Sequence, residues 1–307
     1  MKASFEKSNV KVVVTDDEAL MRGIVLNALG AGGYRDIKAA ANFEQLEQIV
    51  DGTFPDLLIM SSEMADGDAL DFVRRLRMHR IGRNPFVPII MMAWNAEQSF
   101  VRKVVDCGAD VLVMKPFAAA QLYTKIDFLC LDRAPFVVTS SYLGPDRRKA
   151  SRGDDFPSFN VPNTLTDRLN GERFDREELL FRITNVFSAM MRQRRIFQEQ
   201  DIRRYFMAMA EAARDGRPAS ALKGEIGSMI QLAKRYVDEG ASADRRDGER
   251  CVESLAAILR SVVDADDRVS LQDCDAVERL FRKIGVAVPS AIEKAVLCDN
   301  AGLTAAH

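Results

Sequence analysis

The stretch VKVVVTDDEALMRGIVLNALGAGGYRDIKAAA, residues 10–41, contains the alternation on which the fold depends. A short, nearly continuous apolar run at its start is followed by Leu20, Ile24 and Ala28 at helical spacing, and then by a second apolar run, Ile37–Ala41. Apolar runs of this length are typical of strands that are covered on both faces. The stretch therefore predicts a strand, a helix and a second strand parallel to the first.

The same alternation continues to about residue 130. Further apolar runs lie at Leu57–Met60, Pro88–Ala93 and Val111–Met114, with amphipathic segments between them. Five repeats of strand and helix predict an α/β fold, a five-stranded doubly wound parallel sheet of the flavodoxin type with right-handed crossovers. In such folds the functional groups lie at the carboxyl ends of the strands.

The remainder of the chain has a different character. Residues 131–172 are rich in Pro and Gly and include the basic segment GPDRRKASR, so we interpret them as a linker after a first domain at 1–130. Residues 173–300 carry helical apolar stripes and predict an all-α domain, with 301–307 as a tail. Ser270, with Asp273 three residues later, predicts a capping box at the start of one of these helices.

Composition narrows the possible classes of protein. The chain has 307 residues, 47% of them apolar, and a net charge of −2, so it is neither disordered nor a basic nucleic-acid-binding domain. Five cysteines without a CxxC pair, and only two histidines, favour reduced thiols over a disulfide framework or a zinc site. No apolar run approaches the ~20 residues of a membrane span, and the first residues do not form a signal peptide. We expect a cytoplasmic protein that neither inserts into membranes nor binds nucleic acid.

Four motifs occur in a specific order along the first domain. They are Asp16-Asp17 after the first strand, PDLLIM with Met64 and Asp66-Gly67 around the third, VPIIMMA at the fourth, and CGADVLVMKPF at the fifth. In this combination residues 10–130 resemble a response-regulator receiver domain of the chemotaxis-regulator type. The resemblance implies a phosphorelay pathway, in which an aspartate at the end of the third strand takes a phosphoryl group from a kinase phosphohistidine.

The resemblance also implies which positions do the chemistry. An acidic pair holds Mg²⁺, a lysine after the fifth strand neutralises charge, a hydroxyl and an aromatic residue respond to the phosphoryl group, and a proline follows a cis peptide. The corresponding positions in this chain are Asp16 and Asp17 for the acidic pair, Lys115 for the lysine, Pro116 for the proline, Ser61 for the phosphoacceptor, Ala93 for the hydroxyl and Leu112 for the aromatic residue.

Three of these positions therefore lack the expected side chain, including the acceptor. Ser61 carries a neutral hydroxyl, which needs an adjacent base to act as a nucleophile, and no histidine lies near it in the sequence. Asp16 and Asp17 could still bind Mg²⁺ more weakly, or Lys115 could pair with them instead, and the sequence leaves both open. We interpret the domain as a degenerate receiver, without a certain cofactor.

Other motifs receive more ordinary interpretations. Arg148 and Arg152 have the RxxxR spacing of PilZ-type cyclic-di-GMP binders, but the rest of that motif is absent, so we interpret them as part of a solvated turn. Five arginines between residues 192 and 204 alternate with acids and indicate a salt-bridged face. The acidic segment 264–275 has Val269 where a calcium loop needs glycine, and so predicts a loop between helices. Trp94 is expected near the mouth of the pocket, either as a contact for a partner or as simple packing.

We predict a regulatory signalling protein of a two-component or related pathway, not an enzyme, that acts through protein–protein interaction as a pseudo-receiver. Its expected partners are a histidine kinase or another regulator. A homodimer could form through the face of the fourth and fifth strands, which the family commonly uses. The alternative is a phosphorylation-switchable regulator whose helical domain binds DNA or provides another output.

Overall fold

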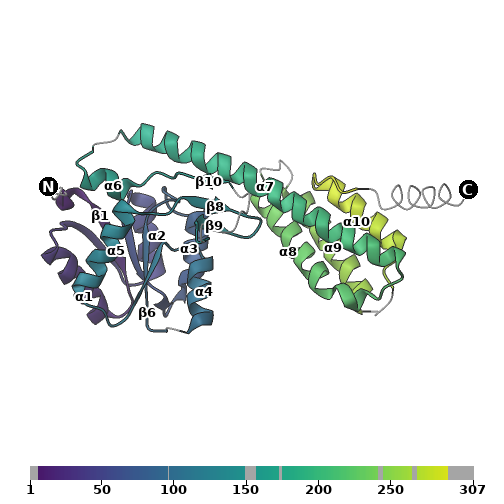
Figure 1. Cartoon of the computed structure of the whole chain (residues 1–307), viewed down its shortest axis with the longest axis horizontal. Helices are drawn as coiled ribbons and strands as arrows, with labels where there is room; N and C mark the ends of the chain where they lie inside the picture. The colour runs from purple at the N-terminus through teal and green to yellow at the C-terminus, as the bar shows by residue number, and fades with distance from the viewer. Residues whose placement is uncertain are drawn as a thin grey trace, which may run out of the picture. The chain divides into compact units, whose positions relative to one another are not determined.

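A computed structural model describes residues 6–95, 97–148, 157–172, 175–240, 245–264 and 268–289 (Figure 1). The chain divides into two compact units, Met1–Met191 and Arg192–His307. The last residues of the predicted helical domain, 290–300, lie outside the described residues, as do Asp266 and Asp267 of the acidic segment.

A five-stranded parallel sheet forms the centre of the first unit, as the sequence predicts. Its strand order is β2-β1-β3-β6-β7. The strands are β1 (Lys11–Thr15), β2 (Asp36–Ala40), β3 (Leu57–Ser61), β6 (Ile89–Ala93) and β7 (Val111–Met114). All five residues of β3 and all five of β6 are buried, which agrees with their continuous apolar sequences.

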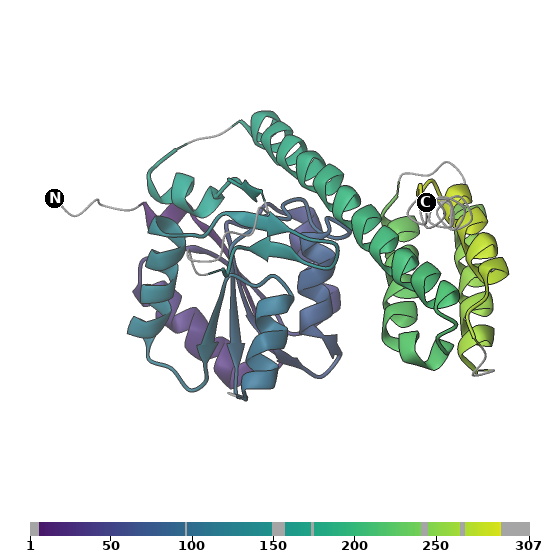
Figure 2. The same cartoon turned by 45° about the vertical axis from the view of Figure 1, so that its right-hand side comes forward.

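Helices cover both faces of this sheet (Figures 1 and 2). The helices α1 (Ala19–Ala31), α5 (Ala119–Leu131) and α6 (Thr164–Leu169) share one apolar core with the sheet. The helices α2 (Phe43–Gly52), α3 (Ala69–Arg77) and α4 (Gln98–Asp106) share the core on the other face. A short 3-10 turn, η1 (Lys7–Asn9), precedes β1.

The buried face of α1 differs from the expected one. The helix buries Met21, Val25 and Leu29 instead of the stripe through Leu20, Ile24 and Ala28. Both stripes are apolar, so their spacing alone does not determine which faces the sheet. As a result Leu20 is 75% exposed and Ile24 is 44% exposed.

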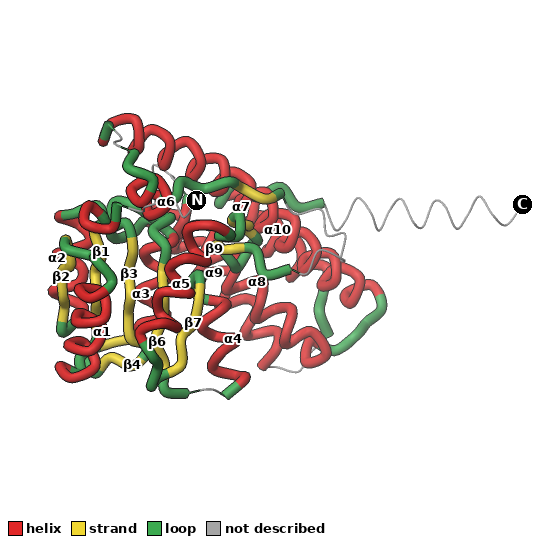
Figure 3. Tube along the Cα trace, turned by 60° about the vertical axis from the view of Figure 1, so that its left-hand side comes forward, coloured by secondary structure: helices red, strands yellow, loops and turns green. Residues whose placement is uncertain are grey.

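Much of the segment expected as a linker is ordered structure within the first unit. Strands β8 (Phe136–Val138), β9 (Leu143–Pro145) and β10 (Ser158–Phe159) form an antiparallel sheet in the order β10-β8-β9, and α6 follows. A two-stranded hairpin, β4 (Glu63–Met64) with β5 (Gly67–Asp68), lies at the opposite end of the main sheet from β9 (Figure 3). Strands β8, β9 and β10 and helix α6 thus form an extension of the first domain, in which Pro135 precedes β8 and Pro145 ends β9.

One long helix, α7 (Arg176–Arg214), carries both the apolar stripe that begins at Leu179 and its continuation through Ile202 and Phe206. Its first half belongs to the first unit, where Leu179 and Ile183 are buried and the Phe187 ring lies 6.5 Å from that of Phe86. The compact units therefore divide at Met191, and not at the predicted start of the helical domain.

The described part of the second unit is helical. It contains the end of α7, the 3-10 turn η2 (Ala219–Leu222), α8 (Lys223–Glu239), α9 (Arg245–Asp264) and α10 (Leu271–Lys283). These helices share one apolar core around Phe206, Met229 and Phe281. The capping box at Ser270 is confirmed, because its hydroxyl accepts from the Asp273 N–H while the Asp273 carboxylate accepts from the Ser270 N–H. In the described residues no helix has the length and apolarity needed to cross a membrane.

Candidate functional site: the pocket at the carboxyl ends of the strands

The predicted site residues converge at the carboxyl end of the sheet. Asp16 follows β1, Ser61 ends β3, and Lys115 follows β7. Strands β6 and β3 lie between β7 and β1 in the sheet. The long Lys115 side chain must therefore extend past Ala93 at the end of β6 to reach Ser61 and Asp16. The Lys115 Nζ donates to Asp16 Oδ2 at 2.7 Å and to Ser61 Oγ at 2.9 Å.

All three side chains of this contact are buried. The side chains of Lys115 and Asp16 are each 1% exposed, and Ser61 is fully buried. A buried ammonium and a buried carboxylate stabilise each other, and removing either one leaves an uncompensated charge. Of the two arrangements that the sequence left open, the structure contains the lysine paired with the first acid.

The remaining polar atoms of the pocket are largely engaged as well. The Ser61 hydroxyl donates to the backbone carbonyl of Glu63 at 2.8 Å. Asp16 Oδ1 accepts from the Glu18 N–H, and Asp17 Oδ2 accepts from the Ala65 N–H. Asp17 is exposed, unlike Asp16, so the acidic pair has one buried and one solvated member.

These residues do not provide a ready site for Mg²⁺, the metal that the fold family implies. Mg²⁺ requires several oxygen ligands in near-octahedral geometry. Here Asp16 is already neutralised by Lys115, Ser61 supplies a neutral hydroxyl, and no group of three metal-binding side chains occurs among the described residues. A metal ion would first have to displace the lysine from Asp16.

Trp94 borders the same pocket. Its ring centre lies 5.7 Å from Lys115 Nζ, its backbone N–H donates to Glu63 Oε1, and the residue is 49% exposed. The second carboxylate oxygen of Glu63 is buried and has no hydrogen-bond partner in the described structure. Sequence inspection did not single out Glu63, because nothing in its spacing shows that it turns back toward the end of β6.

The two positions expected to respond to a phosphoryl group are both apolar. Ala93 is fully buried at the end of β6, and Leu112 packs half-buried against the core beneath α3 and α4. The Lys115–Pro116 peptide is cis. Neither Ala93 nor Leu112 can donate a hydrogen bond into the pocket.

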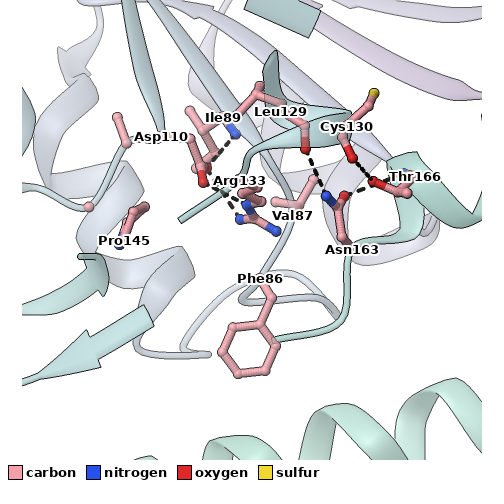
Figure 4. Close-up of polar contacts among 12 residues, drawn as sticks. Phe86, Val87, Ile89, Asp110, Leu129, Cys130, Arg133, Pro145, Asn163 and Thr166 are labelled. Carbon is pink, nitrogen blue, oxygen red and sulfur yellow. Dashed lines mark hydrogen bonds and ion pairs between the residues drawn. The ribbon is translucent and has the colours of Figure 1, made fainter. Parts of the chain in front are cut away.

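A second polar cluster lies at the other end of β7, and sequence inspection missed it. Asp110 accepts hydrogen bonds from Arg133 Nε at 2.7 Å and from the Ile89 N–H at 2.8 Å (Figure 4). It also accepts from Arg77 Nη2 at 2.8 Å. Arg77 also donates to three backbone carbonyls, those of Gly108, Pro85 and Val87. Burial lowers the pKa of Arg77 to about 10 against the opposing effect of Asp110.

This cluster joins the extension to the sheet. Both guanidinium groups lie over the ring of Phe136 in β8, at 5.2 Å for Arg77 and 5.0 Å for Arg133. Nearby, the Asn163 amide and the Thr166 hydroxyl donate to the last carbonyls of α5, those of Leu129 and Cys130 (Figure 4). The arginines lie in charge-rich stretches that resemble solvated surface, so no signal in the sequence distinguishes them.

Several arginines of the second unit lie in ion pairs, as their alternation with acids predicts. Arg194 is buried and forms a bidentate contact with Glu239 at 2.7 and 3.0 Å. Arg203 and Arg204 lie near Glu199 and Asp201, respectively. Most of the segment Arg147–Arg152 lies outside the described residues, but Arg147 donates to the carbonyls of Ala109 and Asp110 and thus belongs to the extension.

The parallel sheet with helices on both faces, and the buried acid–lysine pocket at its carboxyl end, define a doubly wound α/β domain. Residues 12–127 match the family model of the response regulator receiver domain, so this part of the chain is a receiver domain of the two-component response regulators. The match ends before the extension begins.

Known relatives share this part. The chain is 23% identical over 193 residues to the phosphate regulon transcriptional regulatory protein PhoB of Klebsiella pneumoniae, covering 58% of this chain and 81% of that protein. It is 30% identical over 115 residues to the KDP operon transcriptional regulatory protein KdpE of Escherichia coli, covering 38% of this chain and 48% of KdpE. For PhoB of E. coli the covered share is 55%, so the chain spans about half the length of several relatives. Among solved structures, the chemotaxis protein CheY4 of Vibrio cholerae is 24% identical with a TM-score of 0.36, covering 38% of this chain and 96% of that one.

Proposed function

We propose that the protein is a pseudo-receiver, a regulatory component of a two-component pathway that acts through protein–protein contact and not through phosphorylation of an aspartate. The observation that carries this proposal is the buried Lys115, whose ammonium is already bonded to Asp16 and Ser61. A phosphoryl group would normally supply the negative charge at this point. Here the Asp16 carboxylate already supplies negative charge to the lysine.

The chemistry of Ser61 supports the same conclusion. Its hydroxyl proton is donated to the Glu63 carbonyl, and its oxygen accepts from a cation, which lowers its nucleophilicity. A serine nucleophile needs a neighbouring general base. His79 follows the end of α3, at the end of the sheet far from Ser61, and is therefore not placed to act as one.

Exposed apolar side chains near the pocket support a role in binding a partner. Trp94 is 49% exposed just after β6, and on α1, which begins three residues after Asp16, Leu20 and Ile24 are exposed one turn apart. Large exposed apolar groups gathered at one end of a domain often mark interaction sites. We propose a histidine kinase or another signalling regulator as the partner. Contact would include the Trp94 end of the face formed by β6, β7, α4 and α5, and the same face could serve a homodimer.

Intact-mass spectrometry after incubation with acetyl phosphate and Mg²⁺ tests the proposal. We expect the wild-type chain and a Ser61→Asn control to remain unmodified. Ser61→Asp should gain one phosphoryl mass that hydroxylamine removes. A hydroxylamine-labile phosphoryl group on the wild-type chain would overturn the proposal.

One observation favours the alternative of a switchable transcriptional regulator: PhoB and KdpE are named as transcriptional regulatory proteins. In that case the helical unit would bind DNA, and the logarithm of its affinity would fall steeply with the logarithm of the salt concentration. We expect no such dependence, because the described arginines at positions 194, 203 and 204 lie beside carboxylates. Fluorescence anisotropy with a labelled duplex at 50 and 200 mM salt decides between the two.

A further inference from the structure

The second unit contains a cavity of about 600 Å³ that the receiver chemistry does not use. Residues from four helices line it, among them Arg195 of α7, Tyr236 of α8, Arg250 and Cys251 of α9, and Leu280 and Lys283 of α10. We infer that this cavity binds a small organic anion, a molecule that carries a carboxylate or phosphate group on an apolar body. Its volume lies within the ~300–1,000 Å³ that small-molecule sites usually occupy.

The charge of the lining favours an anion. Three cations, Arg195, Arg250 and Lys283, face one described carboxylate, Asp247. Arg250 lies 3.7 Å from Asp247 with both side chains mostly exposed, and such contacts contribute little. Lys283 forms no ion pair with any carboxylate of the described structure, so its charge is available to a ligand.

Arg195 is held in position before any ligand arrives. Its guanidinium carbon lies 3.8 Å from the centre of the Tyr236 ring, and the Tyr236 hydroxyl donates to Glu199 at 2.8 Å. A side chain at Gly240 would come within 3.0 Å of Arg195 Nη1, so the glycine leaves room for the guanidinium group. A planar guanidinium fixed in this way can bind a carboxylate or phosphate in a bidentate manner at little entropic cost.

Glu199 does not fully neutralise Arg195. The closest distance between them is 3.9 Å, and the same carboxylate lies 3.8 Å from Arg203 and accepts from the tyrosine hydroxyl. The Glu199 carboxylate is thus shared among Arg195, Arg203 and the Tyr236 hydroxyl. The positive potential at the cavity therefore persists with this carboxylate in place.

The rest of the lining suits an apolar body. Val237, Leu280 and Ile284 contribute aliphatic surface from α8, α10 and the end of α10. Inorganic phosphate alone would leave this surface in contact with water. A ligand that covers it gains roughly 25 cal/mol for each Å² of apolar surface removed from water.

Two dyes with the same rings test the charge requirement in the full-length protein. 1-Anilinonaphthalene-8-sulfonate is an amphiphilic anion, and N-phenyl-1-naphthylamine is its uncharged counterpart. We expect Arg195→Gln and Lys283→Gln each to weaken the binding of the anionic dye about tenfold, as for the loss of one charged hydrogen bond, and to leave the uncharged dye unaffected. Circular dichroism checks that each variant keeps its helices.

Lys223→Gln is the matched control, because Lys223 is exposed at the start of α8, about 24 Å along the helix from Glu239. It should change neither affinity. Equal affinities of the anionic dye for the wild-type, Arg195→Gln and Lys283→Gln chains would overturn the inference. An equal loss of affinity for both dyes in folded Lys283→Gln would also overturn the inference, because apolar contact alone would then explain the binding. If Arg195→Gln loses its helices, Lys283→Gln alone decides the result, because its side chain has no described ion pair to lose.

Discussion

Replacing Arg133 by methionine tests whether the segment after α5 is part of the receiver domain. Arg133 lies six residues beyond the end of the family match, yet its side chain is only 5% exposed and donates to Asp110 at 2.7 Å. Methionine keeps most of the apolar stem and removes the guanidinium group. If the segment were a solvated linker, the change would have no effect on stability.

The expected size of the effect follows from the contacts. A hydrogen bond to a charged group contributes about 1.5–3 kcal/mol, and the cation over the Phe136 ring adds about 0.5–2 kcal/mol. Asp110 keeps Arg77 as a counter-ion, so no carboxylate is left unpaired. We therefore expect Arg133→Met to cost about 2–4 kcal/mol. In a unit of this size that corresponds to a fall in Tm of about 2–4 °C for each kcal/mol.

Asp110→Asn should cost more than Arg133→Met. It leaves two buried guanidinium groups facing each other without a carboxylate between them, and breaking buried ion pairs costs about 3–5 kcal/mol. Trp94 is the only tryptophan of the chain, so urea unfolding followed by its fluorescence reports on the first unit alone. Arg102→Met, at an exposed position of α4, is the control and should stay within about 0.5 kcal/mol of the wild type. If Arg133→Met is no more destabilising than this control, the reasoning is refuted.

Three further changes probe other groups. Burial raises the pKa of Asp56 to about 6, so the folded protein favours the protonated carboxyl group. The resulting contribution to the free energy of unfolding is complete below pH 4 and is lost as the pH rises through 6. Asp56→Asn should therefore remove up to about 3 kcal/mol of the difference in stability between pH 4.5 and pH 7.5, measured by urea unfolding. Lys115→Met leaves Asp16 buried without its cation and should destabilise the first unit by about 3–5 kcal/mol by tryptophan fluorescence; an unchanged midpoint would contradict the pairing. Ser270→Ala removes a confirmed cap and should cost about 1 kcal/mol, seen as faster hydrogen exchange at the start of α10, with no change in α8.

The sequence predicted the sheet because its signal is repeated and local. Strands β3 and β6 are short apolar runs that are buried throughout, whereas the edge strand β2 (DIKAA) is largely exposed and does not fit the expectation of cover on both faces. All five observed strands begin and end within one residue of the predicted runs. The meeting of Asp16, Ser61 and Lys115 could also be predicted, because the carboxyl ends of parallel strands lie at one edge of a sheet. The sequence could not predict whether the Lys115 ammonium would bond to Asp16, because that depends on distances between side chains.

The extension formed by β8, β9, β10 and α6 was not predicted, and the reason is different. Its strands are two or three residues long, and Phe136 of β8 is buried against Arg77 and Phe86, which lie 59 and 50 residues earlier in the chain. Local composition resembles a linker because Pro135 directly precedes β8 and Gly144 is the central residue of the short strand β9, where a glycine gives no strand signal. A short strand held by a buried arginine leaves no periodic pattern.

Both polar clusters bear on whether the domain can act as a phosphorylation switch. A phosphorylation switch needs a pocket whose charge balance changes when the phosphoryl group arrives, so that two conformations exchange populations. Around Lys115 the balance is already reached with Asp16, and at the other end of β7 Asp110 holds two arginines of which one belongs to the extension. A ligand that binds both conformations with equal affinity does not change their relative populations. For this domain we therefore expect regulation to come from whichever partner covers Trp94 and α1, since those exposed apolar groups are free to contribute binding energy that differs between two states.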